Sequence, residues 1–182
     1  MVKKITEITD EILNSEVLTP KDIPDIDLYM DQILTLFDNK MASSKRFDDD
    51  KLLTKTMINN YSKAKVIEPV KGKKYTKQQI LEMLLVFDLK NNLSINEIKN
   101  LLEPIYNSET EIIDIYQNYL NRKNEINVNI TNLIVNLFDN DIKGDKEMLL
   151  SIMELAYLSN SINKIILKLI DNREEDKVNG IK

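Results

Sequence analysis

Residues 57–83 read MINNYSKAKVIEPVKGKKYTKQQILEM, and this stretch decides the fold. It begins with asparagine, lysine and tyrosine, is interrupted by Pro69 and Gly72, and runs into an almost continuous apolar segment from Ile80. Thr54 precedes it as a candidate N-cap for a helix through MINNYSKA, in which apolar positions recur at helical spacing. The pattern therefore predicts a short helix, an extended turn and a buried helix in succession.

The turn in this stretch has the features of a small β wing. Residues 66–69 and 73–75 are short extended pieces on either side of Gly72, which favours a turn. Thr76 then offers an N-cap for a helix over residues 77–91. Apolar residues surround that helix on nearly all sides, so we expect it to be the central buried helix of the domain.

Two further helices are expected on the amino-terminal side. Residues 3–18 form a short amphipathic arm, which Pro20 and Pro24 separate from the rest of the chain. Asp25 can cap the helix that begins IDLYMDQILTLF, whose apolar residues fall on one stripe. The stretch DNKMASSKRFDDDK, at residues 38–51, has no periodicity and is predicted to be a loop.

The carboxyl-terminal half reads as helices throughout. Ser94 and Glu97 form a capping box for a helix that Pro104 ends or kinks. Apolar residues then recur by threes and fours across residues 109–139, a heptad-like rhythm. A second long amphipathic helix follows the turn around Gly144, so we expect an antiparallel helical hairpin.

Two details of this half follow from the pattern. Ile126, Val128 and Ile130 alternate with asparagines, which is the period of a strand. The longer helical periodicity spans them, so we keep the helix and leave open a break near Asn124. Residues 173–182 are expected to be a frayed tail.

Composition limits the fold and the chemistry. Of 182 residues, three are glycine, four are proline and 42% are hydrophobic, and this economy with helix breakers predicts an all-α protein. Cysteine and histidine do not occur, which removes thiolate nucleophiles, disulfides, most zinc sites and the usual general base. The amino terminus lacks the apolar region of a signal peptide and no segment has the ~20 apolar residues of a membrane span, so we expect a soluble cytoplasmic protein.

The charge is unevenly distributed along the chain. Residues 51–77 contain eight lysines against the single acid Glu68, a net charge of +7. The remainder carries −12, since the whole chain carries −5. An acidic protein with one concentrated basic segment has the pattern of a localised anion-binding surface.

The order of elements, together with TMINNYSKAKVIEP at residues 56–69, resembles the winged helix-turn-helix of MerR-type transcriptional regulators. GKKY at residues 72–75 resembles that family's glycine-basic-x-tyrosine wing, and NLSINEI at residues 92–98 resembles the start of its next helix. Two positions depart from the pattern: Asn59 stands where the family usually has arginine, and Lys65 stands where it usually has glycine.

PDIDLYMDQ at residues 24–32, combined with MINNY, also resembles an uncharacterised family from low-GC Gram-positive bacteria that is described as MerR-like. The resemblance implies an all-α fold in which a MerR-like winged helix-turn-helix domain with a small β wing precedes the helical hairpin. The expected division is an N-terminal arm at 1–24, a DNA-binding domain at 25–105, a dimerisation or effector segment at 106–172 and the tail.

The residues of the basic segment also support DNA binding on physical grounds. Asparagines on a helix in the major groove can pair with adenine, and lysines beside them can meet the flanking phosphates. Tyr61 can donate its hydroxyl to a phosphate, and the wing lysines would follow the neighbouring backbone. Tyr75 is expected to be mainly structural. The predicted DNA-binding residues are Lys55, Asn59, Asn60, Tyr61, Lys63, Lys71, Lys73, Lys74 and Lys77.

Other interpretations of the same residues stay open. Lysine runs are often only a solvated face, with Tyr61 and Tyr75 as half-buried core aromatics. An interaction or adaptor module could keep the fold without binding DNA. We predict no catalytic residue, metal site or cofactor: DNDIKGD at residues 139–145 lacks the ligands of a calcium loop, and Asp27 and Asp31 suit a first helical turn. The long helices either form a homodimer, which the DNA hypothesis favours, or fold back within one chain.

Overall fold

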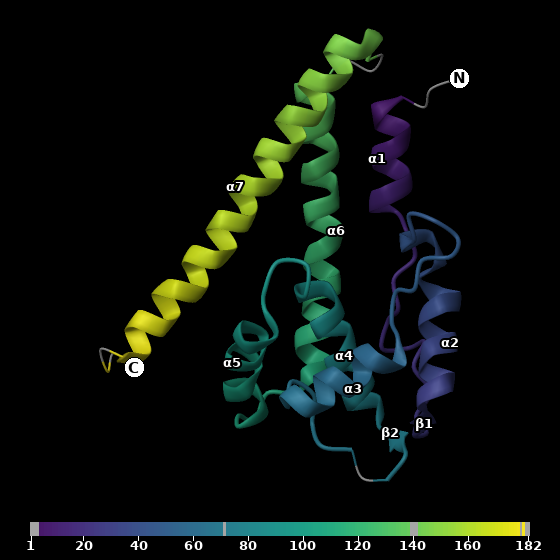
Figure 1. The fold of residues 1–182 in the computed structure, drawn as a ribbon, viewed down its shortest axis with the longest axis vertical. Helices are drawn as coiled ribbons and strands as arrows, with labels where there is room; N and C mark the ends of the chain where they lie inside the picture. The colour runs from purple at the N-terminus through teal and green to yellow at the C-terminus, as the bar shows by residue number, and fades with distance from the viewer. Residues whose placement is uncertain (1–3, 71, 139–141, 179, 181–182) are drawn as a thin grey trace.

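The computed structural model describes residues 4–70, 72–138, 142–178 and 180. Within them the chain is mostly helical, with one pair of very short strands (Figure 1), so the expected helical fold with a small β element is confirmed. The elements in chain order are α1 (Ile5–Leu13), β1 (Leu28–Tyr29), α2 (Met30–Lys40), the 3-10 turn η1 (Ala42–Ser44), α3 (Lys55–Ala64), β2 (Lys74–Tyr75), α4 (Lys77–Leu89), α5 (Ile95–Tyr106), α6 (Ile112–Leu137) and α7 (Gly144–Val178).

Helix α4 is the centre of the core, as its sequence predicts. The Thr76 hydroxyl accepts the Gln79 backbone N–H at 3.3 Å, and Gln79 Oε1 accepts the Thr76 N–H at 2.9 Å, so a capping box starts the helix. Every residue from Ile80 to Val86 is buried. Burial of each large apolar side chain stabilises the fold by roughly 1.5–3 kcal/mol. The surrounding cluster draws residues from Leu18 to Leu120.

The start of α2 differs from the prediction. Asp25 does not cap this helix, because residues 28 and 29 first form strand β1 and the helix begins at Met30. Gln32 Oε1 instead accepts the backbone N–H of Tyr29 at 2.8 Å and satisfies one free donor of the first turn. The carboxylate of Asp25 forms an ion pair with Lys77 Nζ at 2.7 Å.

The wing also pairs differently from the expected hairpin. Strand β2 is antiparallel to β1, with Leu28 opposite Tyr75 and Tyr29 opposite Lys74. Residues 66–69 form no strand, and Val66 and Ile67, which are 0% and 2% exposed, belong to the core. The turn itself is present, and Gly72 has a φ of +86° that side-chain-bearing residues rarely adopt.

The capping box of α5 is confirmed. Glu97 Oε2 accepts the Ser94 N–H at 2.7 Å, and the Ser94 hydroxyl accepts the Glu97 N–H at 3.3 Å. Pro104 lies inside the helix, close to its end at Tyr106. The Tyr106 hydroxyl donates to the backbone carbonyl of Val66 at 2.8 Å and joins α5 to the segment before the wing.

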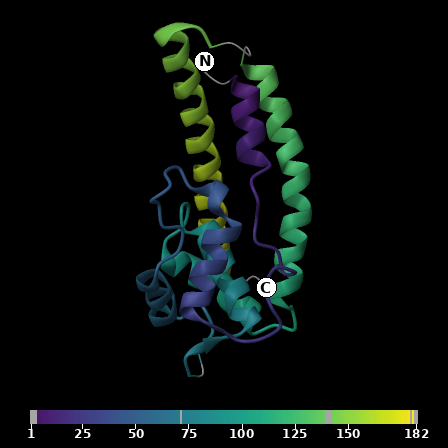
Figure 2. The ribbon, with the colours of Figure 1, turned by 90° about the vertical axis from the view of Figure 1, so that its right-hand side faces the viewer.

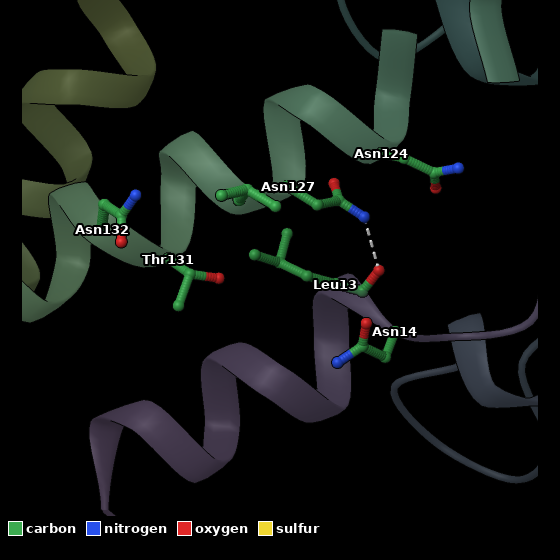
Figure 3. Close-up of a pocket in the computed structure, with 7 residues that line it drawn as sticks. Leu13, Asn14, Asn124, Asn127, Thr131 and Asn132 are labelled. Atoms are coloured by element: carbon green, nitrogen blue, oxygen red, sulfur yellow. Dashed lines mark hydrogen bonds between the residues drawn. The ribbon is translucent and has the colours of Figure 1, made fainter. Parts of the chain in front are cut away.

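The amino-terminal arm is a helix that lies along α6 (Figures 1 and 2). Ile5 of α1 shares a small buried cluster with Ile134 and Phe138 at the end of α6. At the other end of α1, Asn127 Nδ2 donates to the carbonyl of Leu13 at 2.7 Å, inside a groove of about 320 Å³ (Figure 3). Helix α6 runs without a break through Asn124.

Helix α7 runs obliquely from the upper end of α6 towards α5 (Figure 1). Near its carboxyl-terminal end, Arg173 Nη1 donates to the carbonyl of Asn100 at 3.0 Å. The Asn100 amide in turn donates to Glu174 Oε1 at 3.0 Å. The frayed tail predicted from residue 173 is therefore wrong at its start, because helical structure and contacts to α5 continue there and the helix ends at Val178. Among the described helices, none has the length and apolarity to cross a bilayer.

Candidate nucleic-acid interface

Helix α3 presents one polar face to solvent. The Thr54 hydroxyl accepts the backbone N–H of Met57 at 3.2 Å, which confirms the predicted N-cap. Ile58 and Tyr61 are 0% and 4% exposed and fix the inner face of the helix. The exposed residues lie one helical turn apart on the other side, and they are Lys55, Thr56, Asn59, Asn60 and Lys63.

Tyr61 does not belong to this exposed face. Its side chain is 4% exposed, and its buried hydroxyl has no hydrogen-bond partner in the described structure. Burial raises the pKa of this phenol. The expectation that Tyr61 meets a phosphate is therefore wrong, because the inward side of an amphipathic helix takes its tyrosine into the core. Tyr75 is also buried, at 6% exposed, in keeping with its expected structural role.

Two of the predicted lysines are held in ion pairs. Lys55 Nζ lies 2.6 Å from Asp31 Oδ1 of α2, and both side chains are more than half exposed. Lys77 Nζ lies 2.7 Å from Asp25, with 26% of the lysine side chain exposed. Exposed pairs of this kind contribute only about 0–1 kcal/mol, so a phosphate can compete for the lysine.

The other predicted lysines differ in their surroundings. Lys63 and Lys73 are exposed, and the structure records no ion pair or hydrogen bond for either side chain within the described ranges. Lys74 Nζ lies 4.9 Å from the ring centroid of Tyr29, a cation–π contact that leaves the lysine exposed. Lys71, also a predicted DNA-binding residue, lies outside the described residues.

The wing and α3 lie at the same end of the molecule. Figures 1 and 2 both place α3 and the β1–β2 pair at the lower end, away from the end of α6 and the start of α7. Asn59 and Asn60 on the helix and Lys73 and Lys74 on the wing thus come from separate segments to one end. Both segments were predicted to bind DNA, and the wing was assigned a different strand partner.

A buried carboxylate that was not predicted from the sequence contacts the segment before the wing. Glu82 of α4 is 0% exposed. One oxygen accepts the backbone N–H of Glu68 at 2.7 Å, and the other accepts from Gln78 Nε2 at 3.3 Å. Burial raises the pKa of Glu82 to about 7, while the bond from Glu68 acts in the opposite direction. The signal that could have found it is a single acid in the apolar run 80–87.

The aspartates near the amino terminus have structural partners. Asp22 Oδ2 accepts the backbone N–H and the hydroxyl of Thr19, at 2.9 and 2.7 Å. Its other oxygen lies 2.7 Å from Lys40 Nζ, and these bonds lower the pKa of Asp22 to about 2. Asp27 is exposed. No group of three or more acidic side chains that could hold a metal ion occurs in the part of the chain that the structure describes.

Residues 18–121, more than half of the chain, match the sequence profile of the domain of unknown function DUF1836. The chain belongs to the DUF1836 family. The DUF1836 region takes in both strands, α2 to α5 and the first part of α6, so it contains the exposed face of α3, the wing and Glu82. Helices α1 and α7 lie outside it. No curated protein matches the chain, and no solved structure does.

Proposed function

We propose that this protein is a DNA-binding transcriptional regulator that reads promoter DNA with α3 and contacts the flanking phosphates with its wing. The observation that carries the proposal is the exposed face of α3, where Asn59 and Asn60 lie between Lys55 and Lys63. Short amides can form paired hydrogen bonds with adenine in the major groove. Lysines at both ends of the same face can neutralise phosphates on either side.

The resemblance to MerR-type regulators gives further support. The order of helix, loop, helix, wing and two more helices is the one that the resemblance predicts. Lys65, which stands where that family usually has glycine, ends α3 in the left-handed conformation with φ 59° and ψ 37°. Glycine is the residue that adopts this conformation most easily. The backbone at position 65 therefore has the conformation expected of the family's glycine, although the residue is a lysine.

A homodimer formed through α7 completes the proposal. Among the side chains of α7 that the structure describes, ten large apolar ones are 37–72% exposed, and positions 148, 152, 155, 162 and 169 advance in heptad-like steps. Full burial of one such side chain removes roughly 60–120 Å² from water, so burying the exposed portions of all ten covers on the order of 500 Å² per copy. A standard interface takes about 800 Å² per partner, and exposed apolar residues of α6 such as Val128 can add to it.

An adaptor module is the second candidate, and the ion pairs favour it. Asp31 and Asp25 already neutralise Lys55 and Lys77, which lowers the positive charge available to a phosphate backbone. In that case the same end of the molecule would bind a protein. The two candidates differ in salt dependence, because only the neutralisation of a polyanion releases condensed counterions.

Fluorescence anisotropy on duplex DNA from upstream of the gene, with a scrambled duplex beside it, separates the candidates. We expect preference for the native duplex, with log affinity falling linearly against log salt at about −0.9 per neutralised phosphate. Replacing Lys73 and Lys74 by glutamate should reduce that slope by about 1.8. The matched control replaces two exposed lysines elsewhere, Lys21 and Lys168, by glutamate. Absence of binding to both duplexes at low salt would reject the regulator and favour the adaptor.

A further inference from the structure

The wing begins with a segment that has no strand partner. Residues 66–69 follow α3 and precede the turn at Gly72, and they form neither helix nor strand. Backbone groups that leave regular structure need other partners when they are buried. In this segment, side chains of α4 and α5 supply them.

Three side chains hold this segment, which we term the wing root. Glu82 accepts the backbone N–H of Glu68 at 2.7 Å. The Gln79 amide donates to the carbonyls of Glu68 and Pro69, at 3.2 Å each. The Tyr106 hydroxyl donates to the carbonyl of Val66 at 2.8 Å. The wing is thus fixed at its far end by pairing with β1 and at its root by buried side chains.

Of the three side chains that hold the wing root, Glu82 is the one whose burial costs the most free energy. A carboxylate that is 0% exposed loses its hydration, and an apolar residue of similar size would be buried there without that loss. Packing alone therefore does not account for an acid at this position. Its bond to the Glu68 N–H is the contact that an apolar residue could not provide.

We propose that Glu82 is a positioning residue for DNA binding, whose buried oxygen holds the wing root and so keeps Lys73 and Lys74 at the same end of the molecule as the exposed face of α3. The inference rests on the proposed DNA-binding function and extends it to a residue that touches no DNA. Lys73 and Lys74 follow the root closely along the chain, so a root that moves carries them away from the phosphates. A displaced lysine keeps its charge but loses its charge-assisted hydrogen bond to the phosphate.

Two substitutions separate the acceptor from the packing. Glu82→Gln keeps an oxygen that can accept the Glu68 N–H, whereas Glu82→Met keeps the length and fills the space without an acceptor. We expect E82Q to bind DNA within twofold of the wild type. We expect E82M to bind at least fivefold more weakly, with a thermal midpoint that is unchanged or higher because a buried acid has gone.

A double-mutant cycle shows whether Glu82 acts through the wing. With Lys73 and Lys74 already replaced by glutamate, E82M should cause no further loss of affinity. An equal loss in both backgrounds would overturn the proposal, because it would mean general damage to the fold. Tyr106→Phe removes only the hydroxyl bond to the same root and should weaken binding about twofold in the wild-type background alone, which gives a second variant should E82M not fold.

Amide hydrogen exchange at Glu68, followed by NMR without DNA, tests the anchor by itself. We expect exchange at least tenfold faster in E82M and close to the wild type in E82Q. Unchanged exchange in E82M would overturn the proposal even if DNA binding fell. If the wild type binds no DNA while exchange responds as expected, the proposed function fails and the positioning role fails with it, although the anchor stands.

Discussion

The DUF1836 region and α7 are both helical, but the large apolar side chains are mostly buried in the first and mostly exposed in the second. In the first, Ile80 and Met83 are 0% exposed. In the second, Ile165 is 61% and Tyr157 is 72% exposed. A helix gains most of its stability in a protein from packing of its apolar face, so α4 is stabilised within one chain, whereas much of the apolar surface of α7 is exposed to solvent. The main buried core therefore lies in the DUF1836 region, and the proposed dimer interface lies in α7.

The largest contrast should appear when one isoleucine is shortened in each region. Ile80→Ala leaves a cavity in the core and should lower the free energy of unfolding by about 2–5 kcal/mol. Ile165→Ala should change it by less than about 0.5 kcal/mol in dilute protein. Urea titration at two protein concentrations measures both. If I165A is destabilising only at the higher concentration, α7 is buried between copies; a large loss in dilute protein would place Ile165 in the intramolecular core instead.

Glu82 offers a test of the core through pH. Its pKa is raised from 4.5 to about 7 in the fold, so the folded state binds this proton more tightly than the unfolded chain. The resulting stabilisation is fully present below the pKa of 4.5 in the unfolded chain, and it is lost as the pH rises through the pKa of about 7 in the folded state. We expect the wild type to lose about 3 kcal/mol relative to Glu82→Gln between about pH 4 and pH 8. Parallel pH profiles of the two proteins would show that Glu82 is not buried.

The pH difference between these two proteins isolates Glu82 from other groups. The charge of Glu68 raises the pKa of Glu82 further, and the charges of both acids raise the pKa of Tyr106 in α5. Asp22, whose pKa is lowered to about 2, acts in the opposite sense: it adds stability above its unfolded value of 3.8 and loses it in stronger acid. Its effect is common to both proteins and cancels.

The exposed face of α7 gives the next prediction. Met153 and Tyr157 line a hollow of about 430 Å³ with Leu137 and Leu150. Replacing both by glutamate should weaken dimerisation at least tenfold, about 1.4 kcal/mol, measured by sedimentation equilibrium. Lys164→Glu changes the net charge by the same amount on the same helix and is the control. A wild type that stays monomeric at high concentration would instead favour a chain that folds back on itself.

The sequence predicted what depends on neighbouring residues. Thr54, Thr76 and Ser94 each precede a helix by one position, and their caps form within three residues, so local chemistry determined them. Periodicity likewise predicted the burial of α4. These signals require no knowledge of what lies across the fold.

Features that depend on distant segments were not predicted. The pairing of β1 with β2 joins residues 28 and 75, and neither strand is long enough to show its own period. Tyr61 is an exception, because its spacing from Ile58 already favoured the apolar face of α3, where the structure buries it. Nothing in the sequence indicated that Lys77 is paired, because its partner Asp25 lies far away along the chain.

The smallest effect concerns the end of α3, where Lys65 has a backbone conformation that favours glycine. Lys65 has a φ of 59°, a conformation that costs an L-residue about 1–2 kcal/mol. Glycine escapes this cost but loses about 0.5–1 kcal/mol of chain entropy on folding. Lys65→Gly should therefore stabilise the protein by about 0.5–1 kcal/mol, or roughly 1–4 °C in thermal midpoint.

Lys63→Gly is the matched control for this substitution, because it removes the same charge from inside α3 and should cost about 1 kcal/mol. Its effect on DNA should differ too, since Lys63 lies on the exposed face of α3 proposed to bind DNA and Lys65 ends the helix. Calorimetry and anisotropy on the two variants would thus separate the geometry of the helix end from its charge. Opposite signs of stability change are expected; destabilisation by K65G would mean that the left-handed end of α3 is not formed.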